Sequence, residues 1–316
     1  MDDESKESNS SRHNNLFEGA LFDVEHALVM HATSFCTFLA EEIYDSEKLA
    51  SLNSVIETCH IYLIGYTPMI YFICARQEDD NLLMHMQFEI LGNQHTLSYG
   101  IPKGLSLKHD RELAYLEDVD GRRHWPSDNK MQLILSAKSK AVTFDVKYVG
   151  QAYGQDGSRN PVDRLLKHET LQKIALKQAP SGYRLTVLLL AVQPDNQVIT
   201  QMNPFAKNRC DGGERIKSGL DKLFNTTEPE RITLYEAALI RYFCPEYNKV
   251  FKNSFPSTRL KILQDCYEKD FSAVIAEISI NELPFRLFSQ SIEPDIHHFA
   301  VHNLHKNEDR RMFFGL

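Results

Sequence analysis

The segment Leu185–Val192 constrains the fold of this chain most strongly, because all but one of its residues are apolar. Turn-forming residues bound it on both sides, with Gly182 before it and Pro194 after it. A short continuous apolar run of this kind is typical of a strand that is covered on both faces. The sequence therefore predicts a central buried strand over Tyr183–Gln193.

The first third of the chain predicts both helices and strands. Apolar residues recur at three- and four-residue spacing over Glu18–Val29 and Phe35–Ile43, which indicates helices. A third helix is predicted over Glu47–Leu63, because Asp45 or Ser46 can cap its first turn. Runs rich in β-branched and aromatic residues predict two strands. These strands are expected over Met69–Ala75 and Leu82–Leu91.

A turn-rich junction at His124–Asn129 separates this region from the middle of the chain. The sequence therefore predicts an α+β protein of four parts. A polar lead over residues 1–15 is expected to be disordered. An α+β domain over 16–125 is expected to serve oligomerisation or regulation. A central domain over 126–260 and a C-terminal α/β extension over 261–316 complete the chain.

The central part predicts a hairpin and a helix before the buried strand. Met131–Ser136 and Ala141–Val149 are short apolar or alternating runs of strand length. Arg164 and His168 then lie four residues apart on a helix predicted from Pro161, so they project from one face. A planar cation beside an imidazole can hold a phosphate and move a proton. The alternative is a solvated helix face without a function.

Glu236 lies within a later helix whose start is well marked. Thr227 and Glu230 have the spacing of a capping box, so the helix is predicted from Glu228 to just before Pro245. A carboxylate on a mostly apolar helix either reaches solvent or is held for a metal. The aromatic side chains near it are interpreted as core residues or as stacking platforms for bases. They are Tyr235, Tyr242, Phe243 and Tyr247.

The order of these elements resembles that of the GIY-YIG nuclease family over roughly residues 130–255. The resemblance implies a three-stranded antiparallel sheet flanked by helices and a site for phosphodiester hydrolysis. The residues that match the family's site are Tyr148 in Tyr-Val-Gly, Arg164 and His168 on the next helix, Glu236, and Asn248 in Pro-x-Tyr-Asn.

The first motif of that family, Gly-Ile-Tyr, has no counterpart at its expected place. It should fall near Met131–Leu135, where the sequence has neither glycine nor tyrosine. A tyrosine from elsewhere, such as Tyr153, is one candidate for the vacant position. The alternative function is a catalytically degenerate protein that keeps the fold and binds nucleic acid or regulates.

The resemblance also implies a chemistry. Glu236 would hold one Mg²⁺ (or Mn²⁺), and Arg164 would neutralise the phosphate. Tyr148 or His168 would activate water, and Asn248 would orient Glu236 or the phosphate. The expected substrate is DNA rather than RNA, in a restriction, defence or mobile-element context. The side chains expected to contact DNA are Lys147, Lys167, Gln151 and Lys249.

Two further segments have open interpretations. The stretch Asp195–Thr226 is either a DNA-contacting loop or a tolerated surface insertion. A histidine group near the C-terminus matches no common zinc spacing and is interpreted as surface or core histidines. Its members are His297, His298, His302 and His305.

Charge is unevenly distributed along the chain. The whole sequence has a net charge of −8, with 35 Lys and Arg against 43 Asp and Glu. Residues 126–260 hold 20 basic and 13 acidic side chains, a balance of +7, and the rest of the chain has a balance of −15. The central domain is therefore suited to meet phosphate.

The cysteine spacing and the hydropathy of the sequence indicate the cellular compartment of the protein. The six cysteines have no C-x-x-C spacing, which favours reduced thiols. The most apolar stretch, Ile61–Cys74, is shorter than the roughly 20 residues that a bilayer span needs. We therefore expect a cytoplasmic protein without membrane contact.

Overall fold

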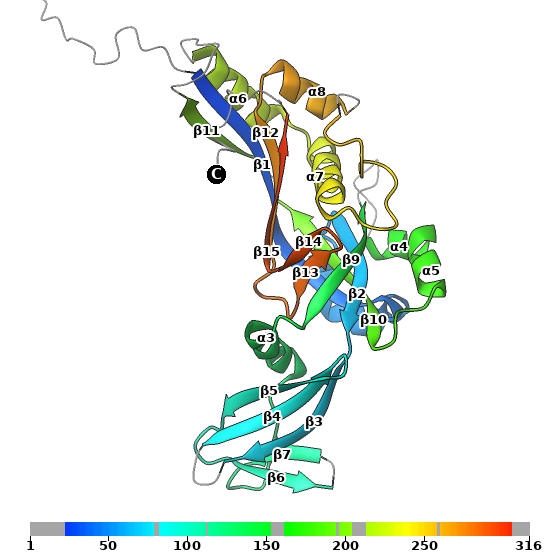
Figure 1. The fold of residues 1–316 in the computed structure, drawn as a ribbon, viewed down its shortest axis with the longest axis vertical. Helices are drawn as coiled ribbons and strands as arrows, with labels where there is room; N and C mark the ends of the chain where they lie inside the picture. The colour runs from blue at the N-terminus through cyan, green and yellow to red at the C-terminus, as the bar shows by residue number, and fades with distance from the viewer. Residues whose placement is uncertain are drawn as a thin grey trace, which may run out of the picture.

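A nine-stranded sheet forms the centre of the computed structural model, which describes residues 23–78, 82–111, 113–152, 161–193, 196–203, 213–257 and 260–304. Its strands are β1 (Asp23–Leu39), β2 (Ile61–Pro68), β9 (Thr143–Gln151), β10 (Tyr183–Val192), β11 (Gln197–Asn203), β12 (Ala273–Ser279), β13 (Arg286–Ser289), β14 (Ile292–Asp295) and β15 (His297–Asn303). They run in the order β14-β13-β9-β2-β10-β1-β12-β15, and β11 pairs with β1 (Figure 1). Strands from both ends of the chain therefore lie beside strands from its middle.

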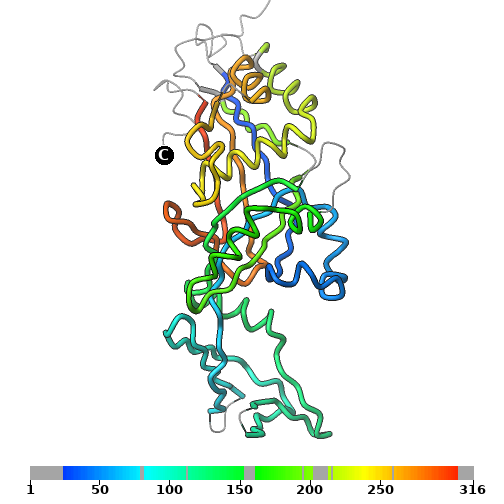
Figure 2. The backbone as a smooth tube through the Cα atoms, turned by 90° about the vertical axis from the view of Figure 1, so that its right-hand side faces the viewer, coloured from blue at the N-terminus to red at the C-terminus, as the bar shows by residue number. Residues whose placement is uncertain are grey.

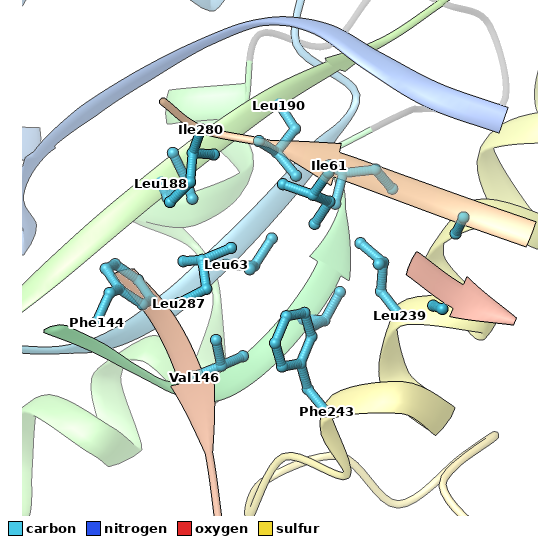
Figure 3. Close-up of a cluster of buried hydrophobic side chains, with 14 of the residues drawn as sticks. Ile61, Leu63, Phe144, Val146, Leu188, Leu190, Leu239, Phe243, Ile280 and Leu287 are labelled. Atoms are coloured by element: carbon cyan, nitrogen blue, oxygen red, sulfur yellow. The ribbon is translucent and has the colours of Figure 1, made fainter. Parts of the chain in front are cut away.

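Strand β2 lies between β9 and β10 and pairs antiparallel with both. All of β2 and the C-terminal part of β10 are buried, because side chains on opposite faces enter different hydrophobic cores. Ile61 and Leu63 enter a core that helix α7 (Glu228–Phe243) covers, as Figure 3 shows. Tyr62 and Leu189 enter the second core. The predicted central strand over Tyr183–Gln193 is confirmed.

The second core is covered by short helices. They are η1 (Ala40–Tyr44), α1 (Ser46–Leu49), η2 (Ala50–Leu52), α2 (Asn53–Ile56), α4 (Pro161–Leu166) and α5 (Glu169–Leu176). Asp45 caps α1, as predicted, by accepting a hydrogen bond from the Lys48 backbone amide. The predicted helix over Glu47–Leu63 is too long, because its last residues belong to β2.

The predicted helices over Glu18–Val29 and Phe35–Ile43 are wrong for most of their described residues. Residues 23–39 form the single long strand β1, and helix begins only at Ala40. The N-terminal half of β1 pairs with β11 and β12, and its C-terminal half pairs with β10. Burial on both faces gives a strand apolar residues at irregular spacing, which mimics a helical period.

The segment between β2 and β9, residues 69–141, forms an arm that extends along the long axis of the molecule (Figures 1 and 2). Its elements are β3 (Ile70–Gln77), β4 (Leu83–Ile90), β5 (Asn93–Gly100), β6 (Ser106–Asp110), β7 (Leu113–Glu117), β8 (Arg123–His124) and α3 (Asp128–Lys138). The first three strands form one antiparallel sheet and the next three form another. The strands predicted over Met69–Ala75 and Leu82–Leu91 are confirmed as β3 and β4. Strand pairing crosses the predicted boundary near Pro126, since β1 and β2 pair with β10 and β9.

The hairpin predicted over Met131–Ser136 and Ala141–Val149 is half wrong. Its second run is β9, but its first run lies in helix α3, which Ser127 caps through the Lys130 amide. Met131 and Leu135, four residues apart, both enter the main core. Apolar residues at that spacing suit a helix as well as a short strand, which is why the pattern misled.

The remaining helices are α6 (Gly213–Asn225) and α8 (Lys261–Glu268). Helix α6 and strand β11 fill much of the stretch Asp195–Thr226, so its described part contains a strand and a helix instead of one long loop. Helix α7 begins and ends as predicted, and the Thr227 amide donates to the Glu230 carboxylate in the predicted box. Among the described residues, no helix is long and apolar enough to cross a bilayer.

Candidate active site

Polar side chains gather where β2 pairs with β9. Tyr62 of β2 lies directly opposite Gly150 of β9. The Tyr62 ring stacks on that of Tyr148 with centroids 6.1 Å apart and meets the His168 ring edge-on at 5.5 Å. The Tyr148 and His168 ring centroids are 5.1 Å apart. Two residues predicted from sequence thus share a cluster with a third, Tyr62, that sequence reasoning missed.

Tyr62 escaped notice because the first-strand motif was expected near Met131–Leu135. That placement is wrong, since those residues form α3 and the strand beside β9 is β2. The sequence feature that could have identified Tyr62 is His60-Ile61-Tyr62, which stands at the start of an apolar run. It was hidden because the arm separates β2 from β9 and because this run was assigned to a helix. Tyr153, the earlier candidate, lies outside the described residues.

Gly150 is required by the position of Tyr62. A Cβ atom at Gly150 would lie 2.6 Å from the Tyr62 phenol oxygen and 2.8 Å from the Tyr148 ring. Such distances are well inside van der Waals contact, so any larger residue must displace one of the rings. The glycine of Tyr148-Val149-Gly150 therefore makes room for two stacked tyrosines.

A chain of hydrogen bonds connects Arg164 of α4 to the two phenols. The Arg164 guanidinium donates to the Tyr62 oxygen, and the Tyr62 and Tyr148 hydroxyls hydrogen-bond each other. Burial raises the pKa of both phenols, and the nearby Glu236 carboxylate raises that of Tyr148 further. Both tyrosines are therefore neutral in the resting site, while Arg164 stabilises negative charge that develops on either oxygen.

His168 lies between α4 and α5 instead of within one helix. The prediction that Arg164 and His168 share one helical face is therefore wrong. The His168 Nδ1 atom accepts a hydrogen bond from the Leu171 amide and so caps α5. Burial and the Arg164 charge lower the pKa of His168, which keeps the ring neutral. Because Nδ1 is an acceptor, the ring proton resides on Nε2, where His168 is a hydrogen-bond donor.

Glu236 of α7 approaches the end of β9. Its carboxylate accepts a hydrogen bond from the Gln151 amide and lies close to Arg164. Burial raises the pKa of Glu236 to about 7, and the Arg164 charge and the Gln151 amide only partly oppose this shift. A carboxyl group that titrates near neutrality is typical of functional sites.

Glu236 and Tyr148 both line a cavity of about 540 Å³, here called the Glu236 cleft. Helix α5 forms one wall, and α7 with the loop after it forms the other. The other lining residues are Glu169, Thr170, Lys173, Ile240, Tyr247, Asn248, Lys249, Val250 and Phe251. Tyr62 is buried behind Tyr148, so Tyr148 presents the phenol that a bound substrate would meet.

Asn248, which is expected to orient Glu236 or the phosphate, has its side-chain amide bonded to the backbone of Val149. Its Nδ2 donates to the Val149 carbonyl at 2.8 Å, and its Oδ1 accepts from the Val149 amide at 2.9 Å. These bonds tie the loop after α7 to the strand that carries Tyr148 and Gly150. Asn248 therefore fixes β9 against the cleft.

The predicted DNA-contacting side chains divide into two groups. Lys249 lines the Glu236 cleft, and so does Lys173, which the sequence analysis did not select. Lys147 is partnered elsewhere, with its Nζ 2.8 Å from the Asp145 carboxylate beside a separate small cavity. Lys167 is exposed at the end of α4 and does not line the cleft. Gln151 contributes its backbone amide to Glu236.

The oxygen donors of the cleft suit a hard divalent cation. Mg²⁺ is usually bound by one or two carboxylates and keeps several waters or phosphate oxygens. Glu236 offers one carboxylate beside open space. Within the described ranges, no group of three or more His, Cys, Asp or Glu side chains could enclose a metal ion. These donors fit a cation that water and substrate complete, and they do not fit a closed zinc site.

Most of the C-terminal histidines and the aromatic residues of α7 that the structure describes are buried or hydrogen-bonded within the fold. His298 bonds Tyr242 and the Asp295 carbonyl, and His302 bonds the Ala238 carbonyl. Tyr235 is fully buried and donates to the Glu277 carbonyl. His297 contacts the Glu277 carboxylate, and His305 lies outside the described residues.

No protein-family model, curated protein or solved structure matches this chain.

Proposed function

We propose that the protein is a metal-dependent endonuclease that hydrolyses phosphodiester bonds in DNA, with a site of the GIY-YIG type. One observation carries the proposal. Tyr62, Tyr148, Arg164 and His168 meet in one cluster beside the Glu236 cleft, although Tyr62 is far from the other three in sequence. On this proposal Tyr62 is the first-strand tyrosine of the family, in the sequence His60-Ile61-Tyr62.

The order of the three central strands supports the same assignment. Strands β9, β2 and β10 are consecutive in the sheet, and β2 is antiparallel to both of its neighbours. In sequence, α4 and α5 lie between β9 and β10, and α7 comes after β10, which is the order that the family resemblance implies. The arm is then an insertion between the two strands that carry the tyrosines. On this assignment Tyr62 takes the place of the missing tyrosine, which favours an active nuclease over a degenerate protein that only binds nucleic acid.

The chemistry follows from the donor and acceptor atoms. Tyr148 lines the cleft, and its resting phenol first loses its proton to solvent there. The phenolate then accepts the proton of the attacking water, and Tyr62 and Arg164 behind it stabilise the negative charge on its oxygen. His168, with its proton on Nε2, donates to a phosphate oxygen. Glu236 holds the cation, which when bound supplies Lewis-acid stabilisation of developing negative charge and lowers the pKa of water.

The choice of a nucleic-acid substrate rests on charge. Residues 126–260 carry a balance of +7 in a chain whose total is −8. Lys173 and Lys249 place two of these positive charges in the Glu236 cleft itself. Such a distribution favours a polyanion over a neutral substrate.

The test is cleavage of supercoiled plasmid and of labelled oligonucleotides with Mg²⁺ or with EDTA. Glu236→Gln and Arg164→Ala are each expected to lower the rate at least about 100-fold, because each removes charge stabilisation in the transition state. Glu246→Gln is the control, since this exposed carboxylate pairs with Lys177 outside the cleft. Cleavage that survives both site variants, or that persists in EDTA, would overturn the proposal.

A further inference from the structure

Strand β15 forms one edge of the nine-stranded sheet and pairs antiparallel with β12 (Figure 1). The Leu304 amide donates to the Ser272 carbonyl, and the Ile280 amide donates to the Ile296 carbonyl. Both pairs continue the β12–β15 register, so the hydrogen-bonded pairs fall at the even-numbered residues of β15. The backbone amides and carbonyls of its odd-numbered residues therefore point away from β12, toward the open side of the sheet.

These outward-pointing backbone groups are available for pairing. Those of Phe299, Val301 and Asn303 have no hydrogen-bond partner in the part of the chain that the structure describes. The His297 amide donates to the Asp295 carboxylate at 3.4 Å, so the free edge begins at the His297 carbonyl. A row of free amides and carbonyls on an edge strand is a template for another strand.

The side chains of β15 do not protect this edge. Phe299 is 51% exposed and Val301 is 42% exposed on the outer face, whereas Ala300 between them is buried. The strand at the opposite end of the sheet, β14, carries Glu293 and Pro294. Proline has no amide to offer and a charged side chain opposes burial, so β14 is protected in the way that edge strands usually are. Of these two edges, β15 is the one suited to pairing.

The edge is complementary to a second copy of itself. In an antiparallel pairing centred on Ala300, Phe299 of one copy lies opposite Val301 of the other, and His297 lies opposite Asn303. All of these odd-numbered residues direct their backbone groups to the open side. An aromatic ring opposite a β-branched side chain is a favourable cross-strand pair. Because the arrangement is two-fold symmetric, each contact occurs twice.

Charge does not oppose this pairing, although each chain has a net charge of −8. The outward side chains of Phe299, Val301 and Asn303 carry no charge. The His297 ring has its Nε2 atom 2.8 Å from the Glu277 carboxylate of the same chain, and it would lie opposite the neutral Asn303. No like charges meet across the two strands, which favours a second copy as the occupant of this edge.

We propose that the protein forms a symmetric dimer in which the β15 strands of two copies pair antiparallel and join their sheets into one. Phe299 of each copy exchanges both of its backbone hydrogen bonds with Val301 of the other. The Asn303 amide of each copy donates to the His297 carbonyl of the other. A single strand pair is a small interface, so we expect a reversible dimer with a dissociation constant of about 1–100 µM. The dimer is independent of the proposed nuclease function.

Sedimentation velocity of the full chain at about 1–500 µM measures the association. We expect the monomer to convert to a dimer across this range. Val301→Lys and Val301→Pro should each weaken association at least about 10-fold. The lysine would be buried opposite Phe299, and the proline removes an amide that points away from β12. Ile199→Lys is the matched control, because Ile199 of β11 is also 42% exposed, and it should leave association unchanged.

A second variant tests the register and shows that the loss is not a folding defect. Adding Phe299→Glu to Val301→Lys places opposite charges across the two strands when the pairing is centred on Ala300. The double variant should therefore regain at least about 10-fold in association over Val301→Lys alone. In a pairing shifted by two residues the glutamates would face each other, and association would stay weak.

Hydrogen exchange locates the interface. The amides of Phe299, Val301 and Asn303 should exchange more slowly at concentrations where the dimer forms than at concentrations where the monomer prevails. A protein that stays monomeric up to about 500 µM would overturn the inference. A dimer that both Val301 variants leave unchanged, or one in which the Val301 amide gains no protection, would also overturn it.

Discussion

At the residue scale, the ionised carboxylate of Glu236 lowers the stability of the folded protein, because it is buried. Its carboxyl group is placed where burial raises its pKa to about 7, well above the value of an exposed glutamate. The neutral form is therefore favoured in the folded state. Stability is present at low pH and is lost as the pH rises through 7, because the charged form must then be buried.

Replacing this residue should consequently stabilise the protein while it abolishes activity. Glu236→Gln mimics the neutral carboxyl group, so its stabilising effect should be about 2 kcal/mol larger at pH 8 than at pH 5.5. Urea unfolding at the two pH values measures this difference. A variant that is destabilised equally at both values would show that Glu236 is a structural residue with an ordinary pKa.

The same carboxyl group should couple the metal dependence to pH. A cation and a proton compete for Glu236, so at low Mg²⁺ concentration the cleavage rate should fall as the pH drops below about 7. Raising the Mg²⁺ concentration should move this acid limb to lower pH. Rate profiles at two Mg²⁺ concentrations test the competition, and an acid limb that does not move would contradict it.

At the scale of the element, β9 is built to carry Tyr148 against Tyr62. Gly150 leaves room for the Tyr62 ring, and Asn248 bonds both backbone groups of Val149 between the two motif residues. Strand β9, strand β2 and the loop after α7 thus hold the two phenol rings in a fixed arrangement. A small change in β9 should affect the site although it removes no polar group.

Gly150→Ala tests this requirement. The added methyl group must displace the Tyr62 or Tyr148 ring, which should destabilise the protein by about 1–3 kcal/mol and lower the cleavage rate. Gly100→Ala in β5 is the matched control, because its Cβ would meet nothing closer than 4.0 Å. Unfolding and cleavage are measured on both variants, and equal behaviour would refute the role of Gly150.

The sequence predicted elements whose signals are local and failed where the signal depends on tertiary contacts. The capping box of α7 and the apolar run of β10 are local, and both predictions are confirmed. The predicted helices over β1 and the predicted strand over α3 failed, because burial on two faces and short apolar runs look alike in either conformation. Arg164, His168 and Glu236 were predicted as a group, but Tyr62 required knowing that β2 pairs with β9.

At the scale of the whole molecule, basic side chains are concentrated in residues 126–260. The excess of basic residues over 126–260 is only partly available for substrate. Lys147 is neutralised by Asp145, whereas Lys173 and Lys249 lie in the Glu236 cleft. Phosphate contacts should therefore come from a few lysines at the cleft and not from the basic region as a whole.

The salt dependence of DNA binding measures this difference. Lys249→Ala should reduce the slope of log affinity against log salt concentration by about 0.9, the contribution of one phosphate contact in B-form DNA. Lys147→Ala is the matched control and should leave the slope unchanged. If the slope falls equally in both variants, Lys147 contacts phosphate as Lys249 does, and the prediction is contradicted.

We propose above all that Tyr62 completes a site that cuts DNA. The arm separates Tyr62 from Tyr148 in sequence, but the pairing of β2 with β9 places the two residues side by side. The rate of Mg²⁺-dependent plasmid cleavage by the wild-type protein and by Tyr62→Phe tests it most directly. The wild-type protein should convert supercoiled plasmid to nicked or linear forms. Tyr62→Phe should be at least about 100-fold slower, because the Tyr148 oxygen loses the hydroxyl that would stabilise negative charge on it. Equal rates for the two proteins, or no cleavage by the wild type with Mg²⁺ or Mn²⁺, would contradict the claim.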